Sequence, residues 1–275
     1  SYNLDFETYL FMGTYKTGAD SKVFQGRICD FLMLVIVDKT DNNYSFLPIN
    51  RDTMSEVRLI QDDGTGAATA ELQLCTAHWY GGNAEQSCAN TVESISKLFG
   101  GLKINGYYAI PMDEIPKLNH SVGGVTVTLL EDFQDIDRQM KKGETLVLSD
   151  EQAYHYIHDR YGVGDEKNTS RMKRQQQYME AFFTKAKEKA KSDKAYVGQL
   201  FREFEQTATT NLTAKKISGL TNRLIKGTQK GFFEIKGTSK IGKALGDGID
   251  HAEFYPDKES IIDVMTKIYG LKKRE

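Results

Sequence analysis

The sequence predicts an α/β fold, an α/β/α sandwich with a mixed central sheet and an additional helical C-terminal part packed on it. Two observations favour this class. Apolar or alternating segments of strand length lie between segments of helical periodicity along most of the 275 residues. No proline- or serine-rich linker, internal repeat or low-complexity segment interrupts them. We therefore expect one domain over residues 1–275, with a core over about 7–191 and the helical C-terminal part over about 192–275.

The central strands are the clearest local signal. Residues 31–37 form a continuous apolar run, which predicts a strand that is buried on both faces. A short turn-forming segment follows, and residues 44–49 predict a second strand, so the two should pair as a hairpin. Asp30 precedes the first strand, while Arg51 and Asp52 follow the second, and antiparallel pairing would bring these three to one sheet edge. Other strands are predicted over residues 10–14, 104–110, 124–130 and 231–235.

Helices are predicted from apolar side chains three and four residues apart and from start and stop signals. Ser149 followed by Gln152 is a capping-box pattern, and it opens a helix over about residues 150–160. Residues 55–86 contain several glycines and are expected to be rich in loops. Other helices are predicted over residues 87–99, 113–119, 170–191, 193–207, 213–226 and 257–269.

The composition excludes several classes of protein. A net charge of −2, from 36 basic and 38 acidic residues, gives no global field for nucleic acid or anionic lipid. No apolar run approaches the roughly 20 residues of a membrane helix, and no signal peptide is visible. The chain begins at Ser1, so we expect a processed or truncated form. Cys75 and Cys88 could be bonded in an oxidising compartment, although small buried thiols are the favoured reading.

One face of the long helix predicted after residue 170 changes character along its length. Because residues three and four apart share a helix face, Arg171, Arg174, Gln175, Tyr178 and Phe182 form one stripe. The stripe is charged near the helix start and apolar further along, as if it left the core and entered a polar pocket. A helix N-terminus favours anions, so the two arginines suggest a phosphate or pyrophosphate site. A solvated basic helix start is the equal alternative.

Eight short motifs occur in a fixed order along most of the chain. They are Asp-Phe-Leu-Met-Leu-Val at 30–35, Leu-Pro-Ile-Asn-Arg-Asp-Thr at 47–53, Trp-Tyr-Gly-Gly at 79–82, Asn-Thr-Val-Glu at 90–93, Tyr-Tyr at 107–108, Val-Gly-Gly-Val at 122–125, Ala-Tyr-His-Tyr-Ile-His-Asp-Arg at 153–160 and Arg-Met-Lys-Arg-Gln-Gln at 171–176. In this order they resemble the LytR-CpsA-Psr (LCP) family of bacterial cell-envelope enzymes, and the last motif is the most specific.

The resemblance implies a phosphotransferase on the extracytoplasmic face of the bacterial cell membrane. Such an enzyme would move a glycopolymer, with its phosphate, from a polyprenyl pyrophosphate carrier to a muramic acid hydroxyl of peptidoglycan. The resemblance also implies an apolar tunnel for the lipid and an N-terminal membrane anchor, which this chain would lack by truncation. Nucleic acid is not an expected partner, because the sequence has no helix-turn-helix signature and no extended basic stripe.

The resemblance also assigns residues to the reaction. Arg51 and Arg171 would be catalytic, and Asp52 would either orient Arg51 or deprotonate the acceptor hydroxyl. Arginine suits this chemistry because its planar fork binds phosphate oxygens in pairs. Arg51 should therefore meet the arginines of the long helix at one diphosphate. The full set expected to bind the pyrophosphate is Arg51, Arg160, Arg171, Arg174 and Gln175.

A magnesium ion and a lipid tunnel complete the implied site. Asp30 would bind the ion through oxygen, as a hard cation prefers, and Asp20 could be a second ligand. Tyr178 and Phe182 would line the tunnel. Tyr15 stands where the family usually has a second acidic ligand.

Further departures from the family pattern lie at Ile28, in the segment His-Asp-Arg at 158–160 and in the segment Cys-Thr-Ala-His at 75–78. They leave open the alternative of a non-catalytic member that binds polyprenyl (pyro)phosphate or has a regulatory role.

Overall fold

The computed structural model describes residues 2–15 and 27–270. By its contacts the chain groups into two compact units. Unit 1 combines Ser1–Ala109 with Thr209–Glu275, and unit 2 is Ile110–Ala208. The expected single domain, with its core over 7–191, stays a prediction. Across the described part of the chain, no helix has both the length and the apolar character that crossing a membrane requires.

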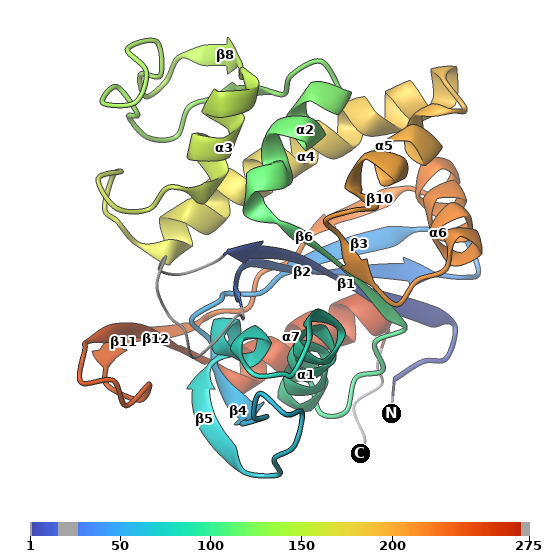
Figure 1. The fold of residues 1–275 in the computed structure, drawn as a ribbon. Coiled ribbons are helices and arrows are strands. Elements are labelled where there is room, and N and C mark those ends of the chain that lie inside the picture. The colour runs from blue at the N-terminus through green and yellow to red at the C-terminus, as the bar shows by residue number, and fades with distance from the viewer. Residues whose placement is uncertain (1, 16–26, 271–275) are drawn as a thin grey trace. The chain divides into compact units, whose positions relative to one another are not determined.

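A six-stranded sheet in the described part of unit 1 confirms the predicted mixed α/β class (Figure 1). The strand order is β10-β3-β2-β1-β6-β9. β10 runs parallel to β3, whereas the β3–β2, β2–β1 and β6–β9 pairs are antiparallel. The strands are β1 (Phe6–Tyr15), β2 (Ile28–Asp38), β3 (Tyr44–Pro48), β6 (Gly106–Pro111), β9 (Thr209–Thr210) and β10 (Gln229–Phe232).

The β2–β3 hairpin has the register that matters for the site. Met33 pairs with Pro48 and Leu34 pairs with Leu47. Beyond the strand ends, the Ile49 amide donates to the Leu32 carbonyl at 2.9 Å and continues the ladder. Because partners in an antiparallel pair advance in opposite directions, the same register reaches residue 51 opposite residue 30. The chain around Arg51 is therefore placed beside Asp30, as the hairpin pattern predicts.

Two helices cover one face of this sheet, α1 (Ala84–Leu98) and α7 (Lys258–Tyr269). Successive strand residues point to opposite faces, so alternate side chains of β1 and β2 form the floor beneath these helices. Figure 1 shows the two helices together on one side of the strands. The buried cluster between them includes Leu10, Met12, Leu34, Ile36, Cys88, Ile95, Phe99, Met265 and Ile268.

Two hairpins were not expected from the sequence. β4 (Met54–Arg58) and β5 (Thr69–Gln73) pair within the segment expected to be loop. β11 (Gly237–Gly242) and β12 (His251–Pro256) pair in a segment for which neither helix nor strand was predicted, so the part after residue 192 is less helical than expected. β11 is exposed along nearly all of its length and therefore has no apolar alternation to mark it as a strand. The helices of that region are α5 (Tyr196–Phe204), α6 (Ala214–Lys226) and α7.

Unit 2 is organised around one buried amide, that of Asn119. Its Nδ2 donates to the Leu148 carbonyl at 3.0 Å and to Asp150 Oδ1 at 2.8 Å. Its Oδ1 accepts from the Val125 amide at 3.0 Å and from the Tyr178 hydroxyl at 3.1 Å. This amide therefore joins its own helix α2 (Ile115–Ser121) to α3 (Asp150–His158), α4 (Asn168–Ser192) and the residues beside β7 (Thr126–Thr128) and β8 (Thr145–Val147). The 3-10 helix η2 (Met112–Glu114) precedes α2.

The predicted capping box at the start of α3 is present. The Gln152 amide donates to Ser149 Oγ at 3.2 Å, and the Ser149 amide donates to Gln152 Oε1 at 2.9 Å. We expect Ser149→Ala to lower the free energy of unfolding by about 1 kcal/mol, because an amide of the first turn loses its acceptor. Urea denaturation followed by circular dichroism measures this. Ser192→Ala, at the C-terminal end of the neighbouring helix α4, is the matched control, with an expected change below about 0.5 kcal/mol.

Candidate functional site

In unit 1, a short turn after β3 presents Arg51 and Asp52. Asn50 builds this turn, since its Oδ1 accepts from the Asp52 amide at 2.9 Å and its carbonyl accepts from the Thr53 amide at 3.0 Å. The backbone is then fixed from two sides. The Cys75 amide donates to the Arg51 carbonyl at 2.9 Å, and the Phe254 amide donates to the Asp52 carbonyl at 2.8 Å. The polar side chains thus stand on an anchored backbone.

Three side chains contact the Arg51 guanidinium. Its Nη1 donates to Asp30 Oδ1, its Nη2 donates to Cys75 Sγ at 3.0 Å, and its Nε lies 3.4 Å from Asp52 Oδ1. Asp30 and Asp52 are buried, whereas 17% of the Arg51 side chain is exposed. Arg51, Asp30 and Asp52 therefore meet at one sheet edge, as antiparallel pairing predicts. Cys75 was not expected in this group.

The electrostatic balance keeps Arg51 a permanent cation. Burial alone would lower its pKa, but Cys75, Asp30 and Asp52 more than offset this, so its pKa is raised. For Cys75, burial is the largest effect and raises the pKa of its thiol. Cys29, Cys75 and Cys88 are all free and buried, which agrees with the reading of small buried thiols.

The predicted magnesium ligands are only partly described. Asp30 is 5% exposed, and its Oδ1 already accepts from Arg51. Asp20 lies outside the described residues, and Tyr15 is exposed at the end of β1. Within residues 2–15 and 27–270, no group of three or more histidine, cysteine or acidic side chains is arranged to hold a metal. A magnesium ion bound through Asp30 would therefore depend largely on waters and on oxygens from a substrate.

In unit 2, the stripe predicted on the long helix is its buried face. Asn168 and all five predicted residues are the buried side chains of α4, whose other positions are partly or fully exposed. The surroundings of this buried face are therefore polar at its N-terminal end and apolar further along. There the Tyr178 and Phe182 rings lie 6.4 Å apart and nearly parallel. Their role in a lipid tunnel stays a prediction.

Arg171 holds the end of α3 against the start of α4. It is 3% exposed, and its Nη1 donates to the His158 carbonyl at 3.1 Å. Its Nε and Nη2 donate to Asn168 Oδ1 at 3.2 and 2.9 Å. Gln175 acts in parallel, because its Nε2 donates to the Ile157 carbonyl at 3.0 Å. These carbonyls lack partners within α3 because they lie in its last turn.

Arg174 also donates to backbone carbonyls near the end of α3, and it has a charged partner as well. Its Nη1 donates to the Tyr156 carbonyl, its Nη2 donates to the Asp159 carbonyl at 2.5 Å, and its Nε lies 2.7 Å from Glu131 Oε2. Burial is the main influence and lowers its pKa, whereas Glu131 acts in the opposite direction. Arg174 thus joins three segments of unit 2. Its predicted contact with a pyrophosphate stays a prediction.

Arg160 differs from these two arginines because it is only half-buried. Its Nε donates to the Glu166 carbonyl at 2.8 Å, and its guanidinium lies 5.2 Å from the centre of the Tyr161 ring. It follows α3 directly in the chain, so the described contacts place it in the same unit as Arg171. Whether the two bind one ligand, and whether Arg51 of unit 1 joins them, stays a prediction.

Comparison with known proteins decides the family. Residues 5–267 match the model of the LytR_cpsA_psr family. The chain belongs to this family. A comparison with curated proteins finds no match.

Solved structures share the fold of this LytR_cpsA_psr protein. TagV from Bacillus subtilis is 21% identical with a TM-score of 0.69, over 97% of this chain and 96% of that one. Protein gbs0355 from Streptococcus agalactiae is 18% identical with a TM-score of 0.73, over 98% and 90%. A structure described as TagT bound to LIIa-WTA is 19% identical with a TM-score of 0.65, over 98% and 92%.

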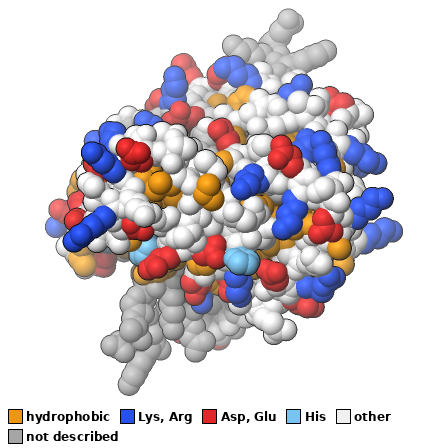
Figure 2. Space-filling model, turned by 90° about the horizontal axis from the view of Figure 1, so that it is seen from above, with side chains coloured by type: hydrophobic (Ala, Val, Ile, Leu, Met, Phe, Trp, Pro, Cys, Tyr) orange, Lys and Arg blue, Asp and Glu red, His pale blue; other side chains and the backbone are white. Residues whose placement is uncertain are grey.

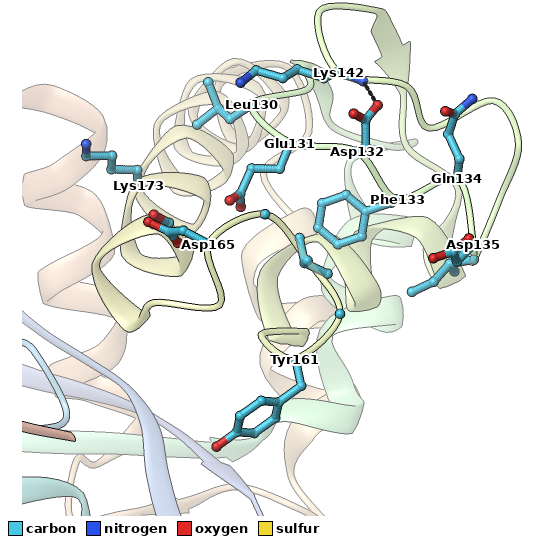
Figure 3. Close-up of a pocket in the computed structure, with 15 residues that line it drawn as sticks. Leu130, Glu131, Asp132, Phe133, Gln134, Asp135, Lys142, Tyr161, Asp165 and Lys173 are labelled. Carbon is cyan, nitrogen blue, oxygen red and sulfur yellow. Dashed lines mark hydrogen bonds between the residues drawn. The ribbon is translucent and has the colours of Figure 1, made fainter. Parts of the chain in front are cut away.

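A cavity of about 870 Å³ lies beside the Arg174–Glu131 pair of this LytR_cpsA_psr protein (Figure 3). Carboxylates outnumber cations in its wall, and none of the predicted pyrophosphate ligands lines it. Figure 3 shows the Glu131 carboxylate near its centre. This cavity is therefore unsuited to a phosphate group. Its ionisable lining residues are Glu131, Asp132, Asp135, Asp165, Lys142, Lys173 and Tyr161.

Charges of both signs are mixed on the surface. Figure 2 shows one face on which the described basic and acidic side chains are interspersed, without a large region of one sign. A local anion site in this LytR_cpsA_psr protein must therefore come from individual side chains such as those above.

Sequence reasoning missed a cluster of ionisable groups at the end of α3. His155 Nδ1 donates to Asp159 Oδ2 at 2.8 Å, and His158 Nδ1 lies 3.2 Å from Asp159 Oδ1. Burial acts to raise the pKa of Asp159, but the hydrogen bonds from His158 and His155 more than offset it, so the pKa is lowered. The signal was available, because residues three and four apart share a helix face and 155, 158 and 159 have that spacing.

Proposed function

We propose that this protein is an extracytoplasmic phosphotransferase. It moves a glycopolymer from a polyprenyl pyrophosphate carrier to peptidoglycan, with arginines holding the pyrophosphate. The reaction takes place at the extracytoplasmic surface of the membrane, where the polyprenyl carrier lies. Membership of the LytR_cpsA_psr family supports this role, as does the likeness to TagT bound to LIIa-WTA.

The observation that carries the proposal is the Arg51 cluster. The Arg51 guanidinium is permanently charged and lies just after a core strand. It pairs with Asp30 and Asp52, and its side chain is partly exposed. Breaking a pyrophosphate places charge on both phosphates, so a fixed cation that needs no rearrangement stabilises the transition state. The two carboxylates hold the guanidinium plane, and the side chain remains partly exposed, so a phosphate oxygen can approach it. Asp52 acts as the orienter of Arg51 in this arrangement.

Arg171 and Gln175 have a second function in this scheme. They fix the last turn of α3. With Arg160 they are the groups of unit 2 that we propose bind phosphate oxygens. A magnesium ion held by Asp30 and by substrate oxygens would supply additional neutralisation of charge. The apolar end of the α4 stripe, with Tyr178 and Phe182, is the part of unit 2 suited to a prenyl chain.

The proposal is tested with a polyprenyl pyrophosphate-linked glycopolymer and peptidoglycan fragments. We expect wild-type protein to produce a phosphodiester-linked product that mass spectrometry detects. Arg171→Ala should lower the transfer rate by about 100-fold or more, because one charged donor to the transition state is lost. Arg171→Lys keeps the charge without the planar fork and should recover only part of the rate. Lys173→Ala, at an exposed position of the same turn, is the matched control and should leave the rate unchanged.

A second candidate is a module that binds the lipid pyrophosphate without turnover. The observation that favours it is Tyr15 at the end of β1, where the family usually has an acidic ligand, together with an Asp30 oxygen already engaged by Arg51. Tight binding of the lipid pyrophosphate with no product after prolonged incubation with magnesium would decide for this candidate. Product formation by the wild-type protein would exclude it.

A further inference from the structure

The cavity of about 870 Å³ in unit 2 has no role in the function proposed above. It lies mainly between two loops, residues 130–136 and 161–165, and every residue that lines it belongs to unit 2 (Figure 3). The loops come into contact at Gly164. Its φ is +52°, and a Cβ at this position would collide with Glu131 Oε1, so glycine alone fits there.

Backbone hydrogen bonds fix the shape of both loops. In the first loop, the Phe133 amide donates to the Met140 carbonyl at 2.8 Å, and the Ile136 amide donates to the Phe133 carbonyl at 2.9 Å. At the end of the second loop, the Glu166 amide donates to the Val163 carbonyl at 3.0 Å. Because these bonds are already formed, a ligand does not have to order the loops, which lowers the cost of binding.

Exposed apolar side chains converge on this cavity. All of unit 2 is described, and four of its large apolar side chains are exposed. Three of them line the cavity, namely Leu130 at 39%, Ile136 at 40% and Tyr161 at 78% exposure, whereas Val147 does not. A single exposed apolar side chain is ordinary, but several around one cavity indicate a binding surface.

The polar groups of the wall carry charges of both signs. Glu131 is paired with Arg174 at 2.7 Å, so its carboxylate, near the centre of the cavity, is already neutralised. Gln134 and Asp135 have no hydrogen-bond partner among the described residues, which leaves an amide and a carboxylate for a ligand. Figure 3 shows the Lys173 side chain directed away from Glu131, so it takes no part. The other charged lining residues are Asp132, Asp165 and Lys142.

These properties together select the chemistry of the ligand. A strongly charged ligand of either sign would meet groups of its own sign in the wall. A purely apolar ligand would cover the polar groups without pairing them. A sugar chain avoids both costs, because its hydroxyls donate and accept hydrogen bonds. The face of a sugar ring presents C–H bonds, which the negative face of an aromatic ring attracts.

We propose that this cavity is a saccharide subsite, which binds uncharged sugar residues with one sugar ring against Tyr161. The inference rests on the proposed function, in which both the peptidoglycan acceptor and the transferred glycopolymer contain sugars. The Arg160 guanidinium lies 5.2 Å from the centre of the Tyr161 ring, so the subsite adjoins a group that we propose binds phosphate oxygens. Arg160 Nε also donates to the Glu166 carbonyl, so its position does not depend on the ring alone.

Binding is tested without the reaction. A neutral tetrasaccharide of N-acetylglucosamine is titrated into nitrogen-15-labelled protein. We expect shifts of the backbone amides of residues 130–136 and 161–165, with an affinity that does not change with salt concentration because the probe is uncharged. Trilysine and inorganic phosphate are the charged probes. Shifts of these amides with either charged probe but not with the tetrasaccharide would overturn the proposal.

Variants on the two loops test the contacts separately. Tyr161→Ala should weaken tetrasaccharide binding by about threefold to tenfold, whereas Tyr161→Phe keeps the ring and should bind as wild type does. Asp135→Ala, on the opposite loop, should weaken it by about threefold or more. Both side chains are exposed, so the variants should fold, and thermal melts check this. Val147→Ala is the matched control, an exposed apolar residue outside the cavity, and should bind as wild type does.

The transfer assay identifies the source of the bound sugars. Tyr161→Ala should raise KM for one sugar-bearing substrate by about threefold to tenfold with little change in kcat, because the ring contacts a part of the substrate remote from the reacting phosphate. A rise in KM for peptidoglycan assigns the subsite to the acceptor, and a rise in KM for the lipid-linked polymer assigns it to the donor. Unchanged KM for both overturns its role in transfer. Tetrasaccharide binding by a protein that shows no transfer overturns the phosphotransferase function and leaves the saccharide site standing.

Discussion

Arg51→Ala is expected to abolish detectable transfer and to lower the free energy of unfolding by about 3–5 kcal/mol. The substitution removes the cation that the proposed reaction needs and leaves Asp30 and Asp52 buried without their shared counter-charge. The protein has a single tryptophan, Trp79, which lies in unit 1. Its fluorescence during urea denaturation therefore reports on the unit that contains the substitution.

Two further variants separate charge from geometry at this position. Arg51→Lys should recover most of the stability, because the charge remains, but little of the transfer, because the planar fork is lost. Arg58→Ala is the matched control, since the Arg58 side chain is 43% exposed and its pair with Glu93 is loose at 3.9 Å. It should change stability by less than about 0.5 kcal/mol. Wild-type transfer by Arg51→Ala would contradict the site.

Glu131→Ala is expected to lower the stability of unit 2 by about 3–5 kcal/mol. Arg174 is 1% exposed, so without Glu131 its charge would be buried without a direct ion-pair partner, among carbonyls and the rings of Phe133 and Tyr156. Because tryptophan fluorescence does not report on unit 2, amide hydrogen exchange across α3 and α4 is the suitable measurement.

The Glu131–Arg174 interaction can be isolated by a double variant. Glu131→Ala with Arg174→Met should be more stable than Glu131→Ala alone, because no unpaired charge then remains in the interior. Glu144→Ala, at an exposed position of the same segment, should leave hydrogen exchange unchanged. Equal exchange in Glu131→Ala and wild type would show that the pair does not stabilise unit 2.

The cluster in unit 1 could be predicted because it depends on one hairpin. The apolar run of β2 and the turn after it set the register, and the register alone brings Arg51 to Asp30. Cys75 could not be predicted in the same way. It lies on the 3-10 helix Leu74–Trp79, which follows the β4–β5 hairpin. That hairpin begins at Met54, just after the turn, but it could not be recognised in the sequence because β5 is too exposed.

In unit 2 the face of α4 was predictable but the partners of its arginines were not. Helical periodicity groups Arg171 with Tyr178 whatever surrounds them, so the shared burial follows from the sequence. The acceptors are backbone carbonyls of α3 and a carboxylate 43 positions away from Arg174, at residue 131. Such contacts depend on the path of the loop that precedes β8, and no local sequence pattern determines that path.

The pairing of β6 with β9 has a consequence for synthesis. Ala109 and Thr209 face each other in that ladder, so everything between them leaves unit 1 and returns to the neighbouring position. Unit 2 is one uninterrupted segment and can collapse as soon as it emerges. Unit 1 must wait, because β9, β10 and the helix α7 that covers its sheet are made last. Until then one apolar face of β1, β2 and β3 is covered only in part, by α1, which makes the half-made sheet the stage most vulnerable to aggregation.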